Sequence, residues 1–401
     1  MKPDEYIWAN LNLVTMRDFG GPNVVQEFLQ NFPGAKVFDR NKVVITFDLY
    51  IPPRDERVAQ NQQVLRRFAT NQGIRLFDVN TGVGQHIIME NGLVKPGSIV
   101  IGTDSHMNLL GAIGAAGFGM GTSDIAAAMY KGKLWFKVPR TIQIIINGIL
   151  KFPVTAKDVI LFILKKIGTS GALNRAIEFT GETTRMMNLS ERITMASMVT
   201  EMSGDIGFIE PDGGVLEFLR TRNVDDIELI SADEDAIYEN VYEFDITNLK
   251  PQIACPHSPD NVHDVSELAG KKIDQVFVGS CTNGRFEDLK IVAKILEGKK
   301  VKNGVRLIIV PATMEVAHEA VKAGFYKIFL ESGAVVVNPG CALCTTGHPG
   351  ILAPGEVMVS TSNRNFIGKL GKGAEVYLAS PATAAASALR GEITSPMDLS
   401  I

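Results

Sequence analysis

Two short apolar runs each lead directly into a loop that carries cysteines. Residues 274–280 end at Cys281, and residues 334–337 precede a loop that contains Cys341 and Cys344. Both runs have the length and composition of buried strands. The loops are rich in small residues, which let a backbone come close to a bulky ligand. We therefore expect the three cysteines to share one site, which requires a fold that brings both loops together.

Three thiolates are one fewer than the four that usually hold a cubane iron–sulfur cluster. An iron without a protein ligand keeps open positions, and it can bind and polarise a substrate hydroxyl or carboxylate. Spacing alone leaves alternatives open, because the C-x-x-C pair of Cys341 and Cys344 also suits half a zinc site or a redox dithiol. The fourth cysteine, Cys255, is predicted to be a small buried apolar residue.

The composition is that of an ordinary soluble protein. The chain has 401 residues, 45% of them hydrophobic and 21% charged, which suits two or three globular domains. A formal net charge of −4 gives no reason to expect nucleic acid or a membrane as a partner. We find no apolar run of about 18 residues and no signal-peptide pattern. Four irregularly spaced cysteines form no disulfide framework, so we expect a cytoplasmic protein.

Strand-like and helix-like segments alternate in the first third of the chain. Strands are predicted over 42–48, 74–79 and 97–102, with an amphipathic helix over 55–71. This order predicts a mostly parallel sheet covered by helices. Ligands of such sheets bind beyond the carboxyl ends of the strands. Polar residues gather at those ends: Asp48, Gln85, His86, Asp104, Ser105 and His106.

A glycine-rich segment over 110–121 contains a G-x-G pattern. No acidic residue follows it at the place where a dinucleotide site would need one. We therefore predict close backbone packing rather than nucleotide binding. Thr122 is predicted to cap a helix over 123–129.

The composition changes after residues 135–139, and the strand–helix rhythm restarts near residues 248–251. We therefore predict three α/β domains with mostly parallel sheets, over 1–138, 139–249 and 250–401. The second of these contains a short strand over 176–181, with one carboxylate at Glu178, and a helix over 190–202.

Five segments, in this order along the chain, resemble the aconitase family, and most of all its two-chain members that act on 3-isopropylmalate. They are GTDSH at 102–106, VFVGSCTNGR at 276–285, NPGCALC at 338–344, GILAPGE at 350–356 and STSNRNFIG at 360–368. The likeness extends from about Asn10 to the C-terminus. It implies an aconitase-like fold that lacks the swivel domain, and a 4Fe-4S cluster held by Cys281, Cys341 and Cys344.

The resemblance implies a hydro-lyase that dehydrates or isomerises a malate-like 2-hydroxy acid. The leading candidate substrate is 3-isopropylmalate, and homoaconitate or another alkylmalate is the alternative. Dehydration needs a base for the C–H, an acid for the hydroxyl and cations for the carboxylates. In the family the base is a serine on the swivel domain, which two-chain members carry on a small subunit. The resemblance therefore implies a small swivel-domain partner, without which this chain is inactive.

The resemblance also assigns roles to individual residues. It implies that Glu178 and His106 pair to deliver a proton. The implied catalytic residues are Asp48, Asp104, His106 and Glu178. The implied substrate-binding residues are Arg17, Ser105, Arg364 and Lys369.

The chain departs from the family pattern around these residues. Leu49 follows Asp48 where the family has His, and Gln85-His86 reverses a usual His-Gln pair. His86 replaces the lost imidazole only if the local backbone is irregular, because adjacent strand residues face opposite sides. Lys369 stands where Arg is common, and a point charge replaces a bidentate fork. Arg17 stands where two-chain members often have His.

These departures keep further hypotheses open. Asp104 is predicted to face Gln85, or else both Asp48 and Asp104 do structural work by accepting backbone hydrogen bonds. A non-catalytic paralogue that keeps the cluster for sensing or assembly is the second functional hypothesis. A zinc or dithiol protein is the third.

Overall fold

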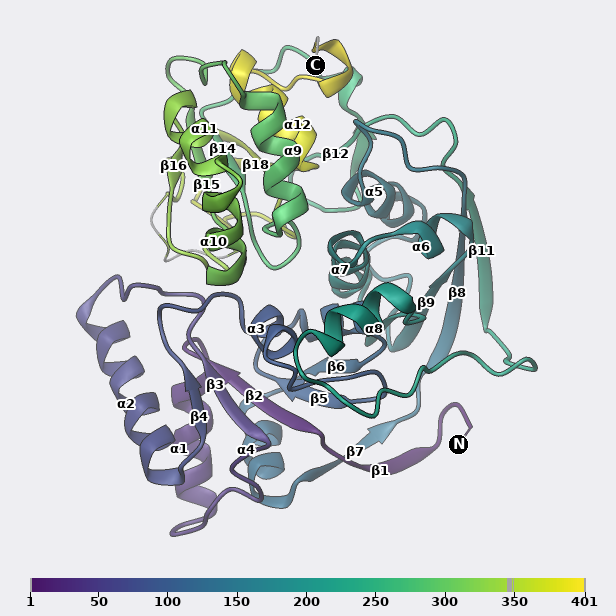
Figure 1. Cartoon of the computed structure of the whole chain (residues 1–401), viewed down its shortest axis with the longest axis vertical. Helices are drawn as coiled ribbons and strands as arrows, with labels where there is room; N and C mark the ends of the chain where they lie inside the picture. Colours follow the sequence, from purple (N-terminus) through teal and green to yellow (C-terminus); the bar gives the residue numbers. More distant parts are fainter. Residues whose placement is uncertain (1, 345–347, 349, 400–401) are drawn as a thin grey trace.

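The computed structural model describes residues 2–344, 348 and 350–399. Four sheets contain the described strands, and one larger sheet lies within each of the three predicted segments. We call these segments the first, second and third domains, and Figure 1 shows them at the lower left, the right and the upper left. The domain boundaries remain our interpretation, while the predicted α/β class with mostly parallel sheets is confirmed. None of the described helices is long and apolar enough to cross a bilayer.

The first domain contains a parallel five-stranded sheet in the order β4-β3-β2-β5-β6. Its strands are β2 (Leu13–Arg17), β3 (Val43–Thr46), β4 (Arg75–Phe77), β5 (Ile99–Gly102) and β6 (Ala116–Gly119). Its helices are α1 (Gly21–Asn31), α2 (Glu56–Gln72), α3 (Gly84–Glu90), α4 (Thr122–Lys131) and the 3-10 helix η1 (Met107–Ile113). One core packs the sheet against α1, α2 and α4, and another packs it against α3 and η1. An antiparallel ribbon of β1 (Tyr6–Asn10) and β7 (Lys133–Lys137) lies beside it.

The second domain contains a parallel four-stranded sheet in the order β10-β9-β8-β11. Its strands are β8 (Arg140–Asn147), β9 (Arg175–Thr180), β10 (Ile206–Ile209) and β11 (Asn240–Asp245). Its helices are α5 (Ala156–Ile167), α6 (Glu182–Met186), α7 (Leu189–Ser197), α8 (Gly213–Arg220) and the 3-10 helix η2 (Met198–Met202). The predicted helix over 190–202 is thus divided, because its last turn tightens into η2.

The third domain contains a seven-stranded sheet in the order β13-β12-β18-β17-β14-β15-β16, parallel except where β12 pairs with β13 and β18. Its strands are β12 (Gln252–Ala254), β13 (Val262–Asp264), β14 (Gln275–Val278), β15 (Arg306–Ile309), β16 (Val335–Val336), β17 (Val357–Ser360) and β18 (Glu375–Ala379). Its helices are α9 (Phe286–Leu296), α10 (Met314–Lys322), α11 (Phe325–Ser332), α12 (Pro381–Arg390) and the 3-10 helices η3 (Val265–Leu268) and η4 (Pro396–Asp398).

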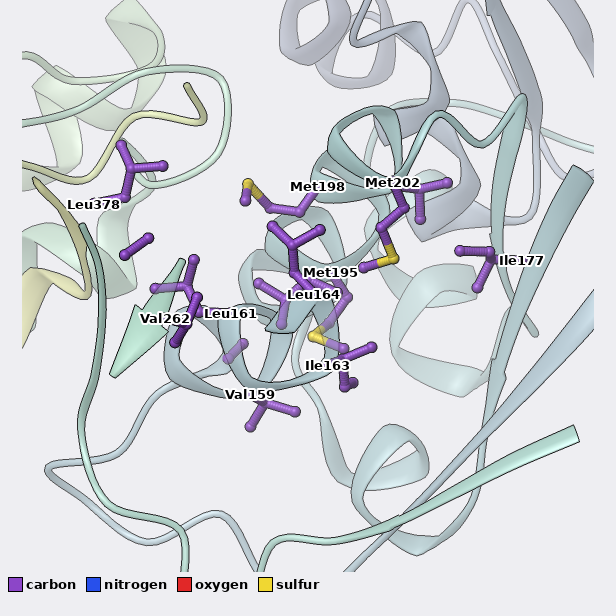
Figure 2. Close-up of a cluster of buried hydrophobic side chains, with 14 of the residues drawn as sticks. Val159, Leu161, Ile163, Leu164, Ile177, Met195, Met198, Met202, Val262 and Leu378 are labelled. Carbon is purple, nitrogen blue, oxygen red and sulfur yellow. The ribbon is translucent and has the colours of Figure 1, made fainter. Parts of the chain in front are cut away.

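The second and third domains share one hydrophobic core. Figure 2 shows Leu161 and Leu164 of α5 in the same cluster of buried side chains as Val262 of β13 and Leu378 of β18. All four side chains are nearly inaccessible to water. Burial of apolar surface stabilises the folded state by about 25 cal/mol per Å², so this shared core binds the two domains into one packing unit.

Local signals account for most of the predicted elements. Asp55 caps α2 by accepting a hydrogen bond from the Val58 backbone N–H at 2.8 Å, and α2 ends at Gly73 in the left-handed conformation. The packing interpretation of the glycine-rich segment is confirmed. A Cβ at Gly111 would lie 1.3 Å from the Gly207 carbonyl oxygen, so the two backbones touch where only glycine fits.

Three local predictions were wrong. Residues 334–337 were predicted as a buried strand, but only Val335 and Val336 pair, at the sheet edge, and Val335 is 55% exposed. Gly121, and not Thr122, is the N-cap of α4. Cys255 is half-buried rather than buried.

Candidate active site

The three predicted cluster cysteines lie together. The side-chain sulfurs of Cys281, Cys341 and Cys344 are all within 4.8 Å of one another. The first follows β14 and the other two follow β16, so a shared sheet edge presents all three. Ser280 and Ala342 take the left-handed backbone, with φ of 81° and 50°. Non-glycine residues adopt this conformation uncommonly, and it often marks functional loops.

The environment of the cysteines favours a thiolate at Cys281. Hydrogen bonds from Cys341 and Cys344 lower the pKa of Cys281 well below its usual value, while the same bonds raise the pKa of the other two thiols. Asn363 also donates to the Cys281 sulfur, at 3.7 Å. Soft, anionic sulfur of this kind is a good ligand for iron or zinc.

A pocket of about 200 Å³ lies next to the cysteines, between the first and third domains. Its wall includes Cys341 and Cys344. The other lining residues are Arg17, Phe19, Leu49, Thr103, Asp104, Ser105, His106, Asn363, Arg364 and Lys369. The structure thus brings six of the eight predicted catalytic and substrate-binding residues to one cavity. The two that are not in this lining are Asp48 and Glu178.

His106 is held by a carboxylate that sequence reasoning missed. Its Nε2 lies 2.8 Å from Oε1 of Glu201 on η2, and Glu201 also accepts from Nε of Arg364, at 2.8 and 3.0 Å. Burial opposes protonation of the ring, but the charge of Cys281 and the bonds to Asp104 and Glu201 outweigh it and raise the pKa of His106 to about 9. The imidazole is therefore a cation, and a proton donor, at neutral pH.

The predicted pairing of Glu178 with His106 was wrong. Glu178 lies on β9, where Tyr238 donates to its carboxylate at 3.1 Å. It does not line the pocket. A signal for Glu201 was available, because a carboxylate in the last turn of a predicted helix opposes the helix dipole and calls for a compensating cation.

Arg17 lies between two aspartates. Its Nη1 makes a close ion pair with Asp104 and lies 3.7 Å from Oδ1 of Asp48. Burial raises the pKa of Asp48 to about 7, and Arg17 opposes that rise. For Asp104, burial is outweighed by Arg17 and His106, which together lower its pKa.

Both aspartates also accept backbone hydrogen bonds, as the structural alternative predicted. The N–H of Gly84 donates to Asp48 at 2.9 Å, and that of His106 donates to Asp104 at 3.0 Å. Asp104 pairs with Arg17 and His106 rather than with Gln85. The two roles, ion pairing and loop anchoring, are thus combined in the same carboxylates.

Gln85 and His86 lie in the first turn of α3, and not on or just after a strand. The Nε2 of His86 lies 2.8 Å from the Cys281 carbonyl oxygen. Burial and the charge of Arg285 lower the pKa of His86 to about 4, so the ring is neutral. His86 holds the Cys281 loop and does not line the pocket. It therefore does not replace the imidazole that the family pattern has at the position of Leu49.

Ser105 and Lys369 complete the polar lining. Oγ of Ser105 lies 3.3 Å from Nδ1 of His106. Nζ of Lys369 lies 5.0 Å from the centre of the Phe366 ring, and burial lowers the pKa of this lysine. Within the described part of the chain, Lys369 makes no ion pair, and its side chain lines the pocket.

The chain matches known proteins along almost its whole length. Residues 4–272 and 265–391 match the Aconitase family (aconitate hydratase). The holo-form of aconitase X from Thermococcus kodakaraensis shares the fold, with a TM-score of 0.54 and 16% identity, and the match covers 89% of this chain and 84% of that one.

Relatives with higher identity carry a common name. The 3-isopropylmalate dehydratase large subunit 1 of Methanopyrus kandleri is 45% identical, over 98% of this chain and 94% of that protein. The protein of the same name from Archaeoglobus fulgidus is 43% identical, over 99% and 95%. The large subunit from Halothermothrix orenii is 43% identical, over 100% and 96%. The chain therefore belongs to the aconitase family, in the group whose relatives are named 3-isopropylmalate dehydratase large subunit.

Proposed function

We propose that this chain is the large subunit of a hydro-lyase that removes water from a malate-like 2-hydroxy acid and adds it back, with 3-isopropylmalate as the substrate. The observation that carries the proposal is the trio of close cysteine sulfurs beside a pocket lined by cations. The relatives named 3-isopropylmalate dehydratase large subunit match almost the whole chain, which further supports the assignment.

We further propose that Cys281, Cys341 and Cys344 hold a 4Fe-4S cluster. The fit rests on the donor set, since three mutually close sulfurs without a fourth ligand among the described residues suit a cluster with one open iron. A closed structural zinc site would need four ligands. When bound, the cluster supplies a Lewis acid for the hydroxyl and a carboxylate of the substrate.

The residues of the chain supply binding and a proton. Arg364 binds a substrate carboxylate through the nitrogens that Glu201 leaves open, and Lys369 adds a second positive charge. His106, kept protonated and oriented by Glu201 and Asp104, gives its proton to the departing hydroxyl. Ser105 orients the same ring.

The base comes from a partner in this proposal. Among the described residues that line the pocket, Asp104 is the one carboxylate, and it is paired with Arg17 and with His106. The relatives are named large subunits, which supports a small, swivel-domain subunit that carries the base. Four free cysteines support a reducing compartment, and we propose the cytoplasm.

One observation favours a second function. Leu49 gives the pocket an apolar side chain where the family resemblance implies an imidazole, as expected of a cluster-binding paralogue without catalysis. One experiment distinguishes the hydro-lyase from the non-catalytic paralogue. This chain and the proposed small subunit are purified together without oxygen, analysed for iron and sulfide, and assayed with a panel of hydroxy acids. We expect about four irons per chain and turnover of 3-isopropylmalate. A bound cluster without turnover of any acid would support the paralogue, and zinc in place of iron would exclude both.

A further inference from the structure

Four unpartnered polar atoms gather around one small cavity behind the pocket. They are Nε of Arg17, Oδ1 of Asp48, and Oε1 and Nε2 of Gln85, which are buried without a hydrogen-bond partner among the described residues. All three residues line a cavity of about 10 Å³, together with Thr15, Thr46, Gly84, Thr103, Asp104 and Met107. Asp48 and Gln85 are 1% and 2% exposed, so bulk solvent does not reach them.

Each of these atoms would be costly to bury alone. An unsatisfied buried donor or acceptor costs about 1–3 kcal/mol, and more if charged. The carboxylate of Asp48 and the guanidinium of Arg17 are fixed by other bonds that leave these atoms free, while the Gln85 amide has no hydrogen bond among the described residues. The backbone N–H of Gly84 donates to Oδ2 of Asp48, and Nη1 of Arg17 donates to Asp104.

The donor and acceptor count identifies the occupant. Two of the atoms, Nε of Arg17 and Nε2 of Gln85, are donors, and two, Oδ1 of Asp48 and Oε1 of Gln85, are acceptors. One water, with two protons and two lone pairs, matches this set of two donor and two acceptor atoms. The two N–H groups disfavour a metal cation, and the carboxylate disfavours an anion. The cavity volume is also that of a single water.

We propose that this cavity binds one water molecule, and that Gln85 is a positioning residue that acts through it. Gln85 and the water hold Asp48 and Arg17 in one arrangement behind the pocket, and Arg17 also lines the pocket itself. The function of this arrangement rests on the proposed hydro-lyase, while the water site itself rests on the geometry alone.

A high-resolution crystal structure of the anaerobically purified two-chain protein tests the water directly. We expect a density peak within about 2.7–3.2 Å of Oδ1 of Asp48 and of the Gln85 amide. Ordered waters elsewhere in the map, with no peak in this cavity, would overturn the proposal. The map gives this answer whether or not the wild-type pair turns over 3-isopropylmalate, so failure of the proposed function is recognised separately.

Two variants test the role of Gln85. Gln85→Met removes both hydrogen-bonding groups at similar length, and we expect a KM for 3-isopropylmalate about 10-fold higher with kcat within about 2-fold, since one buried contact is lost. Gln85→His restores one donor and one acceptor, and it should return KM to within about 3-fold of wild type. An unchanged KM in Gln85→Met would refute the positioning role.

A matched control is Gln275→Met. Gln275 is fully buried in the third domain, where its amide donates to the Gly350 carbonyl at 2.6 Å. Its loss should lower the melting temperature without changing KM. If Gln275→Met raises KM as much as Gln85→Met does, the effect of Gln85 is merely structural and the role proposed for it is wrong.

Discussion

Glu201 accepts hydrogen bonds from both His106 and Arg364, through one carboxylate from the second domain. The proposed general acid, His106, and the proposed binder of the substrate carboxylate, Arg364, are therefore held by the same group. Since Glu201 is 8% exposed and its partners come from the first and third domains, it fixes the relative positions of residues that no single domain could align. This relationship leads to the first prediction.

Glu201→Gln should lower kcat/KM by about 100- to 1,000-fold, because a general acid of this kind contributes a factor of about 10²–10⁴. Removing the carboxylate charge also lowers the pKa of His106, so the alkaline limb of the pH–rate profile should move to lower pH. Glu178→Gln is the matched control and should stay within about 3-fold of wild type, since Glu178 lies outside the pocket. A larger loss of kcat/KM in Glu178→Gln than in Glu201→Gln would show that Glu178 is the functional partner of His106.

Cys341→Ser should abolish the broad visible absorbance of protein purified without oxygen, because two sulfurs do not retain the proposed cluster. Cys255→Ser should leave the spectrum unchanged, since Cys255 is not in the trio. The measurement is absorbance with iron and sulfide content. An unchanged spectrum in Cys341→Ser would show that the cluster assignment is wrong.

Arg364→Lys should raise the activation free energy for kcat/KM by about 2–4 kcal/mol, the usual scale for breaking a charged, buried contact. Lysine cannot both donate to Glu201 and present a fork to a substrate carboxylate. Arg306→Lys changes an arginine that pairs with Glu356 on the surface, and it should have no kinetic effect. Equal kinetics for both variants would remove Arg364 from the site.

Because of Lys157, the free energy of unfolding should rise with pH in the alkaline range. Its ammonium is fully buried and donates to the Thr361 and Ser362 carbonyls at 3.2 and 2.9 Å, and burial lowers its pKa to about 8. Between that value and the unfolded pKa of about 10.4, the unfolded chain binds more protons, so stability rises with pH by about 3 kcal/mol. Below pH 8 both states are protonated and this contribution is constant.

The check on Lys157 is a comparison of unfolding free energies across pH 7–11 for wild type and Lys157→Met. The variant should lack the rise, because methionine does not titrate. The difference between the two curves isolates Lys157 from other groups that titrate in this range. Parallel curves would show that the folded-state pKa of Lys157 is not lowered.

Gly111→Ala should destabilise the protein by about 3 kcal/mol or more, because its methyl group would overlap the Gly207 carbonyl oxygen. Gly213→Ala is the control, since nothing lies within 4 Å of a Cβ there. Melting temperatures of the two variants give the comparison. A harmless Gly111→Ala would contradict close backbone packing in the glycine-rich segment.

Much of the fold follows from local patterns in the sequence. The helix over 55–71 was predicted from apolar spacing, and the cap at Asp55 places its start. The edge position of Val335 was not predictable, because a run of four apolar residues looks the same in the centre and at the margin of a sheet. The short helix at Gln85 and His86 was also missed, since its buried faces are set by tertiary contacts rather than by amphipathic spacing.

The site was predictable where chemistry is concentrated in short motifs. The three cysteines, Arg364 and Lys369 come from three loops that follow strands of one sheet, so the short motifs and the family resemblance together predicted that they converge. The partner of His106 was assigned wrongly. The position of Glu201 near the end of a predicted helix indicates a carboxylate that needs a cation, but only the three-dimensional arrangement shows that this cation includes His106. The ion pairs of Arg17 were missed for the same reason.

The backbone N–H of Cys341 donates to the carbonyl oxygen of Asp48 at 2.8 Å, which joins the third domain to the first. The same loop would hold the proposed cluster, so loss of that cluster should weaken the contact between the first and third domains. We expect the radius of gyration of the whole chain to rise when the proposed cluster is removed, so that small-angle scattering would report how much of the protein carries it.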